Sequence, residues 1–129
     1  MKKQRVLVVD DDRALAEATI KLLHAMDYET ALSDSIAAAE SQLTGDTHFD
    51  LVLLDLDLGA GAQATYDLLD RLATRQIAVP PIIIFSGTAG EEVARAENRI
   101  GSHALLRKPC SAQTLMDAIE RSLNPNAKD

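Results

Sequence analysis

The sequence predicts an α/β fold, a doubly wound parallel sheet with helices on both of its faces. Short apolar runs rich in β-branched residues recur along the chain, and such runs are typical of strands that are buried on both faces. Stretches with the period of amphipathic helices lie between these runs. The connections are short, so the chain is organised as five βα units with right-handed crossovers. We therefore expect a five-stranded sheet in the middle of a three-layer sandwich.

The strands are identified by their apolar runs. The runs of the first, third and fourth strands are strong, as in "RVLVV" and "PIIIF", and those of the second and fifth are weaker. Pro80 and Pro81 stand at the entrance of the fourth strand, where a missing N–H group is tolerated. The predicted strands are residues 5–9, 28–32, 51–54, 81–85 and 103–107.

Helices are predicted where apolar residues recur with helical spacing. We expect Ser111 to be the N-cap of the last helix. Asp12 is interpreted as an acid in the first turn of the first helix, where it stabilises the helix dipole, and the alternative is a direct role at the site. The fourth helix is polar, and its charged residues are interpreted as a solvated face or, alternatively, as a surface that binds a partner. The predicted helices are residues 13–26, 35–43, 63–75, 89–98 and 111–123.

Length and composition favour a single domain. The chain has 129 residues, 47% hydrophobic and 26% charged, which suits one domain of residues 1–124 and a frayed tail of residues 125–129. The formal net charge of −7 disfavours nucleic-acid binding through the bulk surface. The single cysteine excludes an internal disulfide, and no segment has the length and apolarity of a signal peptide or a membrane span. We expect a cytoplasmic domain without nucleic-acid or membrane partners.

Polar residues that carry chemistry follow the predicted strands. In an open parallel sheet, ligands bind beyond the carboxyl ends of the strands, so these residues are expected to share one edge. Like charges at that edge would repel one another unless a cation bridged them, and hard oxygen ligands with room for water suit Mg²⁺. The residues are Asp10, Asp11 and Asp12 after the first strand, Asp55 and Asp57 at the third, Ser86 at the fourth and Lys108 after the fifth.

This set predicts phosphoryl transfer to an aspartate. Asp55 ends a buried strand opposite two other acids, so it can act as a nucleophile that accepts a phosphoryl group. The metal and Lys108 would neutralise the developing charge, and Ser86 would hydrogen-bond a phosphoryl oxygen.

Four segments together resemble the receiver domains of bacterial two-component response regulators. The segments are, in this order, "VLVVDDD", "FDLVLLDLDL", "PPIIIFSG" and "GSHALLRKP", and the resemblance covers essentially the whole chain. The resemblance implies a flavodoxin-like sheet with strand order 2-1-3-4-5. It also implies a phosphoprotein of phosphorelay signal transduction, with Asp55 as the phosphoacceptor.

The resemblance further implies a ligand set and partners. Mg²⁺ would be bound by Asp11, Asp55 and the main-chain carbonyl of Asp57, with Asp10 acting mainly through water. The phosphoryl donor would be a phosphohistidine on a sensor histidine kinase or a phosphotransfer protein, and phosphorylation would switch a surface that binds a downstream protein. Such a domain is not an enzyme, since it catalyses only its own phosphorylation and dephosphorylation. The oligomeric state stays open.

The chain departs from the family pattern at three places. Leu105 stands where an aromatic residue is usual, Cys110 replaces a common Phe after Lys108 and Pro109, and Gly59 opens a loop that often has a Pro. Because of these differences, the sequence does not identify the surface that would pass the signal to a downstream protein. Met1 directly before the first strand suggests a natural N-terminus, and any output domain would lie beyond Asp129.

Two other functions remain open. A degenerate receiver that is never phosphorylated would be a binding module, although the set of Asp55, Ser86 and Lys108 argues against it. The run "LVLLDLDLG" also resembles the D-x-D nucleophile motif of haloacid-dehalogenase-type phosphatases. In that family the acid pair follows the lysine, whereas Asp10 and Asp11 precede every other site residue here.

Overall fold

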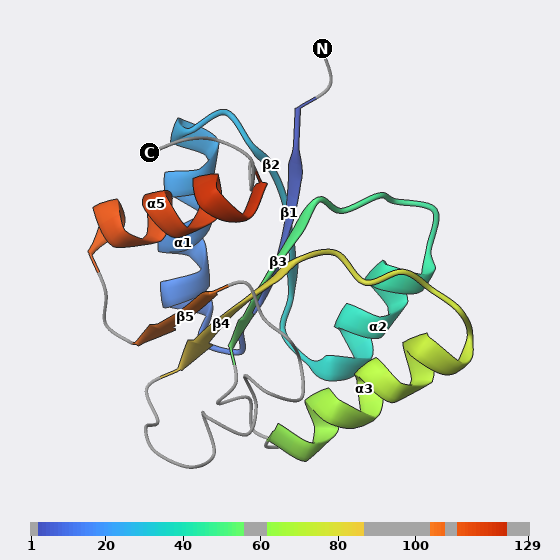
Figure 1. Cartoon of the computed structure of the whole chain (residues 1–129). Helices are drawn as coiled ribbons and strands as arrows, with labels where there is room; N and C mark the ends of the chain where they lie inside the picture. The colour runs from blue at the N-terminus through green and yellow to red at the C-terminus, as the bar shows by residue number, and fades with distance from the viewer. Residues whose placement is uncertain (1–2, 56–61, 87–103, 108–110, 124–129) are drawn as a thin grey trace.

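The structure is a computed structural model that describes residues 3–55, 62–86, 104–107 and 111–123. A parallel sheet forms its central layer, with α1 and α5 on one face and α2 and α3 on the other (Figure 1). The elements are β1 (Arg5–Val9), α1 (Arg13–Ala25), β2 (Glu29–Ser33), α2 (Ile36–Thr44), β3 (Leu51–Asp55), α3 (Ala62–Thr74), β4 (Ile82–Ser86), β5 (Ala104–Arg107) and α5 (Ala112–Leu123).

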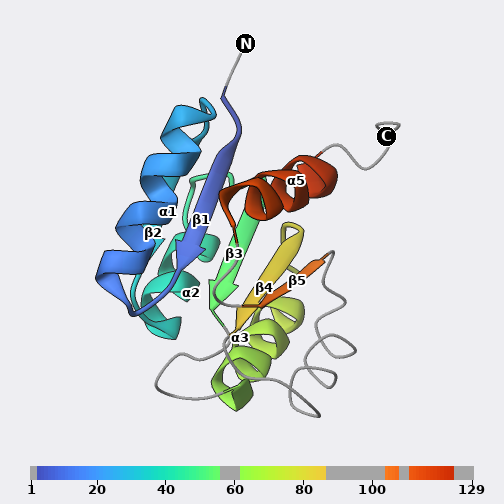
Figure 2. The same cartoon turned by 90° about the vertical axis from the view of Figure 1, so that its left-hand side faces the viewer.

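The five strands have the order β2-β1-β3-β4-β5, and every neighbouring pair is parallel. All strand arrows therefore point to one edge (Figure 2). The chain runs outward from β1 to β2 and then crosses back to β3, so the direction of winding reverses between β1 and β3. In doubly wound sheets this switch point opens a crevice beyond the strand ends. The predicted α/β fold and strand order are confirmed.

The core has two layers because successive side chains of a strand point to opposite faces of the sheet. In β1, Val6 and Val8 pack with the layer beneath α1 and α5, whereas Leu7 and Val9 pack with the layer beneath α2 and α3. All four are at most 3% exposed. Burial on both faces explains why the run "RVLVV" shows no alternation of polar and apolar residues.

Most element boundaries agree with the sequence prediction to within one or two residues. The second strand begins at Glu29 rather than at residue 28. Ser111 caps α5 as predicted, since its hydroxyl accepts a hydrogen bond from the Thr114 N–H at 3.1 Å. The predicted helix 89–98 and the predicted tail 125–129 lie outside the described residues. Within the described ranges, no helix combines the length and apolarity needed to cross a membrane.

Candidate functional site

Three carboxylates meet at the carboxyl edge of the sheet. Each of Asp10, Asp11 and Asp55 offers an oxygen, and these oxygens all lie within 4.8 Å of one another. Asp10 is 5% exposed and Asp55 is 3% exposed, whereas Asp11 faces solvent. Bringing like charges together in a partly desolvated place is unfavourable unless a cation offsets their repulsion. The three carboxylate oxygens are close enough together to hold a hard divalent cation.

Strand register brings these acids together. Val9 of β1 pairs with Leu54 of β3, so the following residues, Asp10 and Asp55, stand next to each other where the two strands end. Asp55 is still part of β3 and pairs with Phe85 of β4. A slip of one residue would exchange the side chains of the strand between the two core layers, so the close packing of both layers opposes it.

Hydrogen bonds shape the turn from β1 into α1. The Asp10 N–H donates to the Ser33 carbonyl of β2 at 3.0 Å, which extends the β1–β2 pairing beyond the strand. The Asp10 Oδ1 accepts from the Asp12 N–H at 2.9 Å. The Asp12 Oδ1 then accepts from the Leu15 N–H at 3.1 Å. Asp11 lies between these two anchored residues.

Asp12 corrects one sequence interpretation. It does not lie in the first turn of α1, because it is the N-cap residue with extended backbone angles, and the first turn contains no acid. A cap acts through a hydrogen bond to an unpaired helical N–H group as well as through its charge. An aspartate followed by a helical apolar pattern is the sequence signal for this role.

The other predicted site residues are only partly placed. Ser86 ends β4, and its backbone pairs with Arg107 of β5, so its position in the chain is at the same edge as Asp55. The Ser86 side chain lies outside what the structure describes, as do Asp57 and Lys108. The structure thus brings together Asp10, Asp11 and Asp55 and leaves the predicted roles of the other three residues as predictions.

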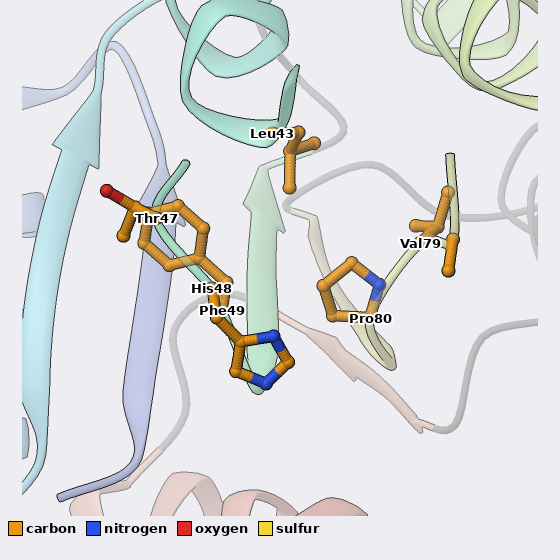
Figure 3. Close-up of a pocket in the computed structure, with 7 residues that line it drawn as sticks. Leu43, Thr47, His48, Phe49, Val79 and Pro80 are labelled. Carbon is orange, nitrogen blue, oxygen red and sulfur yellow. The ribbon is translucent and has the colours of Figure 1, made fainter. Parts of the chain in front are cut away.

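A small cavity opens at the opposite edge of the sheet (Figure 3). Its volume is about 210 Å³, and it lies between the end of α2 and the segments that enter β3 and β4. It contributes nothing to the acidic site, because the strands separate the two edges. The residues that line it are Leu43, Thr47, His48, Phe49, Ala78, Val79 and Pro80.

Comparisons with known proteins agree with this geometry. The family model described as "Response regulator receiver domain" matches residues 6–120. The alginate biosynthesis transcriptional regulatory protein AlgB of Pseudomonas putida is 34% identical over 121 residues, which are 92% of this chain and 26% of that protein. The response regulator protein FleR of Pseudomonas aeruginosa is 32% identical over 117 residues, covering 91% of this chain and 24% of that protein. The chain thus spans about a quarter of the length of these relatives.

Solved structures show the same fold. A CheY-like response regulator receiver domain protein from Methanospirillum hungatei JF-1 superposes with a TM-score of 0.83 at 24% identity, covering 96% of each chain. The non-phosphorylated HemR receiver domain of Leptospira biflexa has a TM-score of 0.78 at 26% identity, covering 98% of this chain and 99% of that chain.

Proposed function

Because this chain belongs to the family of response regulator receiver domains, we propose that its acidic edge accepts a phosphoryl group on Asp55. The observation that carries the proposal is the convergence of Asp10, Asp11 and Asp55 within 4.8 Å at the winding reversal of the sheet. Three carboxylate oxygens held this close together are a ligand set that a hard divalent cation prefers, so the arrangement favours a site for a cation and an incoming phosphoryl group.

The transfer needs one bond exchange. An Oδ of Asp55 attacks the phosphorus of a phosphohistidine as the P–N bond breaks, and the histidine nitrogen keeps the bonding electron pair. Asp55 is suited to this attack because it ends β3 and is held in the register of two neighbouring strands. Hydrolysis of the acyl phosphate by water later returns the carboxylate.

The residues at the edge fit Mg²⁺. Asp10, Asp11 and Asp55 would hold the ion, and Asp57 would add its main-chain carbonyl. When bound, Mg²⁺ neutralises charge on the phosphoryl oxygens. Ser86 would hydrogen-bond a phosphoryl oxygen, and Lys108 would balance the remaining charge. The movement of both residues toward Asp55 would change the conformation of the surface that binds a partner.

The partners follow from this chemistry. A sensor histidine kinase or a phosphotransfer protein would donate the phosphoryl group, and a downstream protein would read the phosphorylated surface. We place this exchange in the cytoplasm. The domain would turn over only its own phosphoryl group, so we do not assign it an enzymatic activity on other substrates.

Intact-mass measurement tests the proposal. The protein is incubated with Mg²⁺ and a small phosphodonor, and we expect one phosphoryl group per chain. Asp55→Asn should abolish the added mass, whereas Asp46→Asn, which removes an exposed acid at the other edge, should leave it unchanged. Labelling that persists in Asp55→Asn would refute the assignment. Wild-type protein without labelling would indicate a degenerate receiver, and steady-state hydrolysis of a phosphate ester would indicate a phosphatase.

A further inference from the structure

Two successive side-chain turns connect the sheet to α1. The Asp10 carboxylate accepts from the N–H two residues on, that of Asp12, at 2.9 Å. The Asp12 carboxylate accepts from the N–H three residues on, that of Leu15, at 3.1 Å. The main-chain carbonyl of Asp12 also accepts from the Ala16 N–H at 2.9 Å, which is the first bond of the helix. Asp12 therefore takes part in all three hydrogen bonds, as the donor in the first and as the acceptor in the other two.

This arrangement fixes the backbone on both sides of Asp11. On one side Asp10 is tied to the sheet through the Ser33 carbonyl, and on the other Asp12 is tied to the first turn of α1. Asp11 itself is exposed, so packing contributes little to its placement. Its approach to Asp55 then depends on the angle at which the chain leaves Asp10 and enters the helix.

We propose that Asp12 is a positioning residue for the metal site. This inference rests on the proposed function, in which Asp10, Asp11 and Asp55 are Mg²⁺ ligands. By capping α1, Asp12 holds Asp11 where its carboxylate reaches Asp55. Among the described residues, the oxygens that lie within 4.8 Å of one another come from Asp10, Asp11 and Asp55, and Asp12 contributes none. Asp12 acts through the cap hydrogen bond and not as a ligand.

Substitutions of Asp12 can separate the effect of its cap hydrogen bond from the effect of its negative charge. Asn is as good an N-cap as Asp but has no charge, whereas Ala provides neither. Asp12→Asn should therefore bind Mg²⁺ nearly as well as the wild type. Asp12→Ala should lose affinity, because binding must then also order the start of α1. A typical cap contribution corresponds to a factor of about five in an equilibrium constant.

A matched control is available in α2. Ser35 caps that helix, and its hydroxyl accepts from the Ala38 N–H at 3.1 Å. Ser35→Ala removes a cap of the same kind from a helix that does not directly follow any of the three acids. It should lower stability much as Asp12→Ala does, without changing Mg²⁺ affinity.

The experiment measures Mg²⁺ binding by isothermal titration calorimetry in the wild type and the four variants Asp11→Ala, Asp12→Ala, Asp12→Asn and Ser35→Ala. We expect Asp12→Ala alone among the cap variants to weaken binding, by about fivefold. The Mg²⁺ concentration that half-saturates labelling by a small phosphodonor should rise by the same factor, with an unchanged rate at saturating Mg²⁺. Amide exchange in the first turn of α1 should also be faster in Asp12→Ala.

The outcomes distinguish this inference from the proposed function. If Asp12→Asn loses as much affinity as Asp12→Ala, Asp12 acts through its charge and the inference is wrong. If Asp11→Ala abolishes binding while Asp12→Ala binds like the wild type, the metal site stands and the positioning role is refuted. Wild-type protein that fails to bind Mg²⁺ would overturn the metal site together with this inference.

Discussion

Arg71 of α3 holds the carboxylate of Glu40 of α2 in a two-pronged contact across 31 residues of sequence. The Arg71 Nη2 lies 2.8 Å from the Glu40 Oε1, and its Nε lies 3.0 Å from the Oε2. This fork geometry is the strong form of the arginine–carboxylate pair. The hydrogen bonds from Arg71 hold the pKa of Glu40 below its ordinary value, although burial acts in the other direction.

Glu40→Gln should destabilise the fold slightly at neutral pH and less at acidic pH. A carboxyl whose pKa is lowered by folding adds stability above its ordinary pKa of 4.5, and this contribution is lost as the pH falls through the lower folded-state pKa. Arg71, whose pKa is raised, stays charged throughout this range. Urea unfolding at about pH 7 and about pH 3 should show a larger difference between variant and wild type at the higher pH. An equal difference at both pH values would contradict an ionic contribution.

Gln76→Gly should stabilise the protein by about 1 kcal/mol. Gln76 follows α3 with a φ of 60°, in the left-handed region that disfavours residues with a Cβ. The Ile77 N–H donates to the Leu72 carbonyl at 2.9 Å and the Gln76 N–H to the Ala73 carbonyl at 3.0 Å, which is the Schellman pattern that usually contains glycine.

Glycine at another position of the same helix provides the control for Gln76→Gly. Ala73→Gly, inside α3 at an exposed position, should cost about 1 kcal/mol, because a helical φ gives glycine no advantage. Chemical denaturation measures both variants. Destabilisation by Gln76→Gly would show that other contacts of the Gln76 side chain outweigh its backbone strain.

The strands and the acids that follow them were predictable because each depends on local sequence, whereas the strand order was predicted from the resemblance to receiver domains. Strands such as β3 are apolar without interruption, and the acids stand where those runs end, so topology alone brings Asp55 beside Asp10. Other features are not local. Asp27 and Gln76 follow the ends of helices with a left-handed backbone conformation, for which glycine is the usual sequence signal. Because neither residue is glycine, the sequence does not indicate where these two helices end. The pairing of Glu40 with Arg71 depends on how α2 packs beside α3, which no sequence period encodes.

Thr65→Val should stabilise the fold by about 1 kcal/mol. Thr65 is 1% exposed, and its hydroxyl has no hydrogen-bond partner in the part of the chain that the structure describes. Valine has nearly the same shape and removes the unpaired polar atom. Thr19→Val is the matched control, because the buried Thr19 hydroxyl donates to the Leu15 carbonyl at 3.1 Å. Thermal unfolding should show a gain for Thr65→Val and no gain for Thr19→Val, and equal shifts would refute the role assigned to the unpaired hydroxyl.

Mg²⁺ should raise the melting temperature, and Asp11→Ala should abolish that effect. A ligand that binds only the folded state stabilises it by mass action, by about 1.4 kcal/mol at ten times its dissociation constant. For a domain of this size that corresponds to a shift of roughly 5 °C. Asp11 is exposed, so its truncation leaves no cavity. Removing one of three clustered negative charges should leave the metal-free protein as stable as the wild type or more stable.

Asp46→Ala separates a specific site from a general effect of charge. Asp46 is an exposed acid in the connection between α2 and β3, so it lies at the edge of the sheet opposite Asp11. Both variants lower the negative charge of the chain by one, and general screening by Mg²⁺ would act on them alike. Differential scanning calorimetry with and without millimolar Mg²⁺ should show the full shift in Asp46→Ala and none in Asp11→Ala. The same shift in melting temperature in both variants would mean that the ion stabilises the protein without using Asp11. The three carboxylates would then have to be explained as an acidic edge that holds no metal.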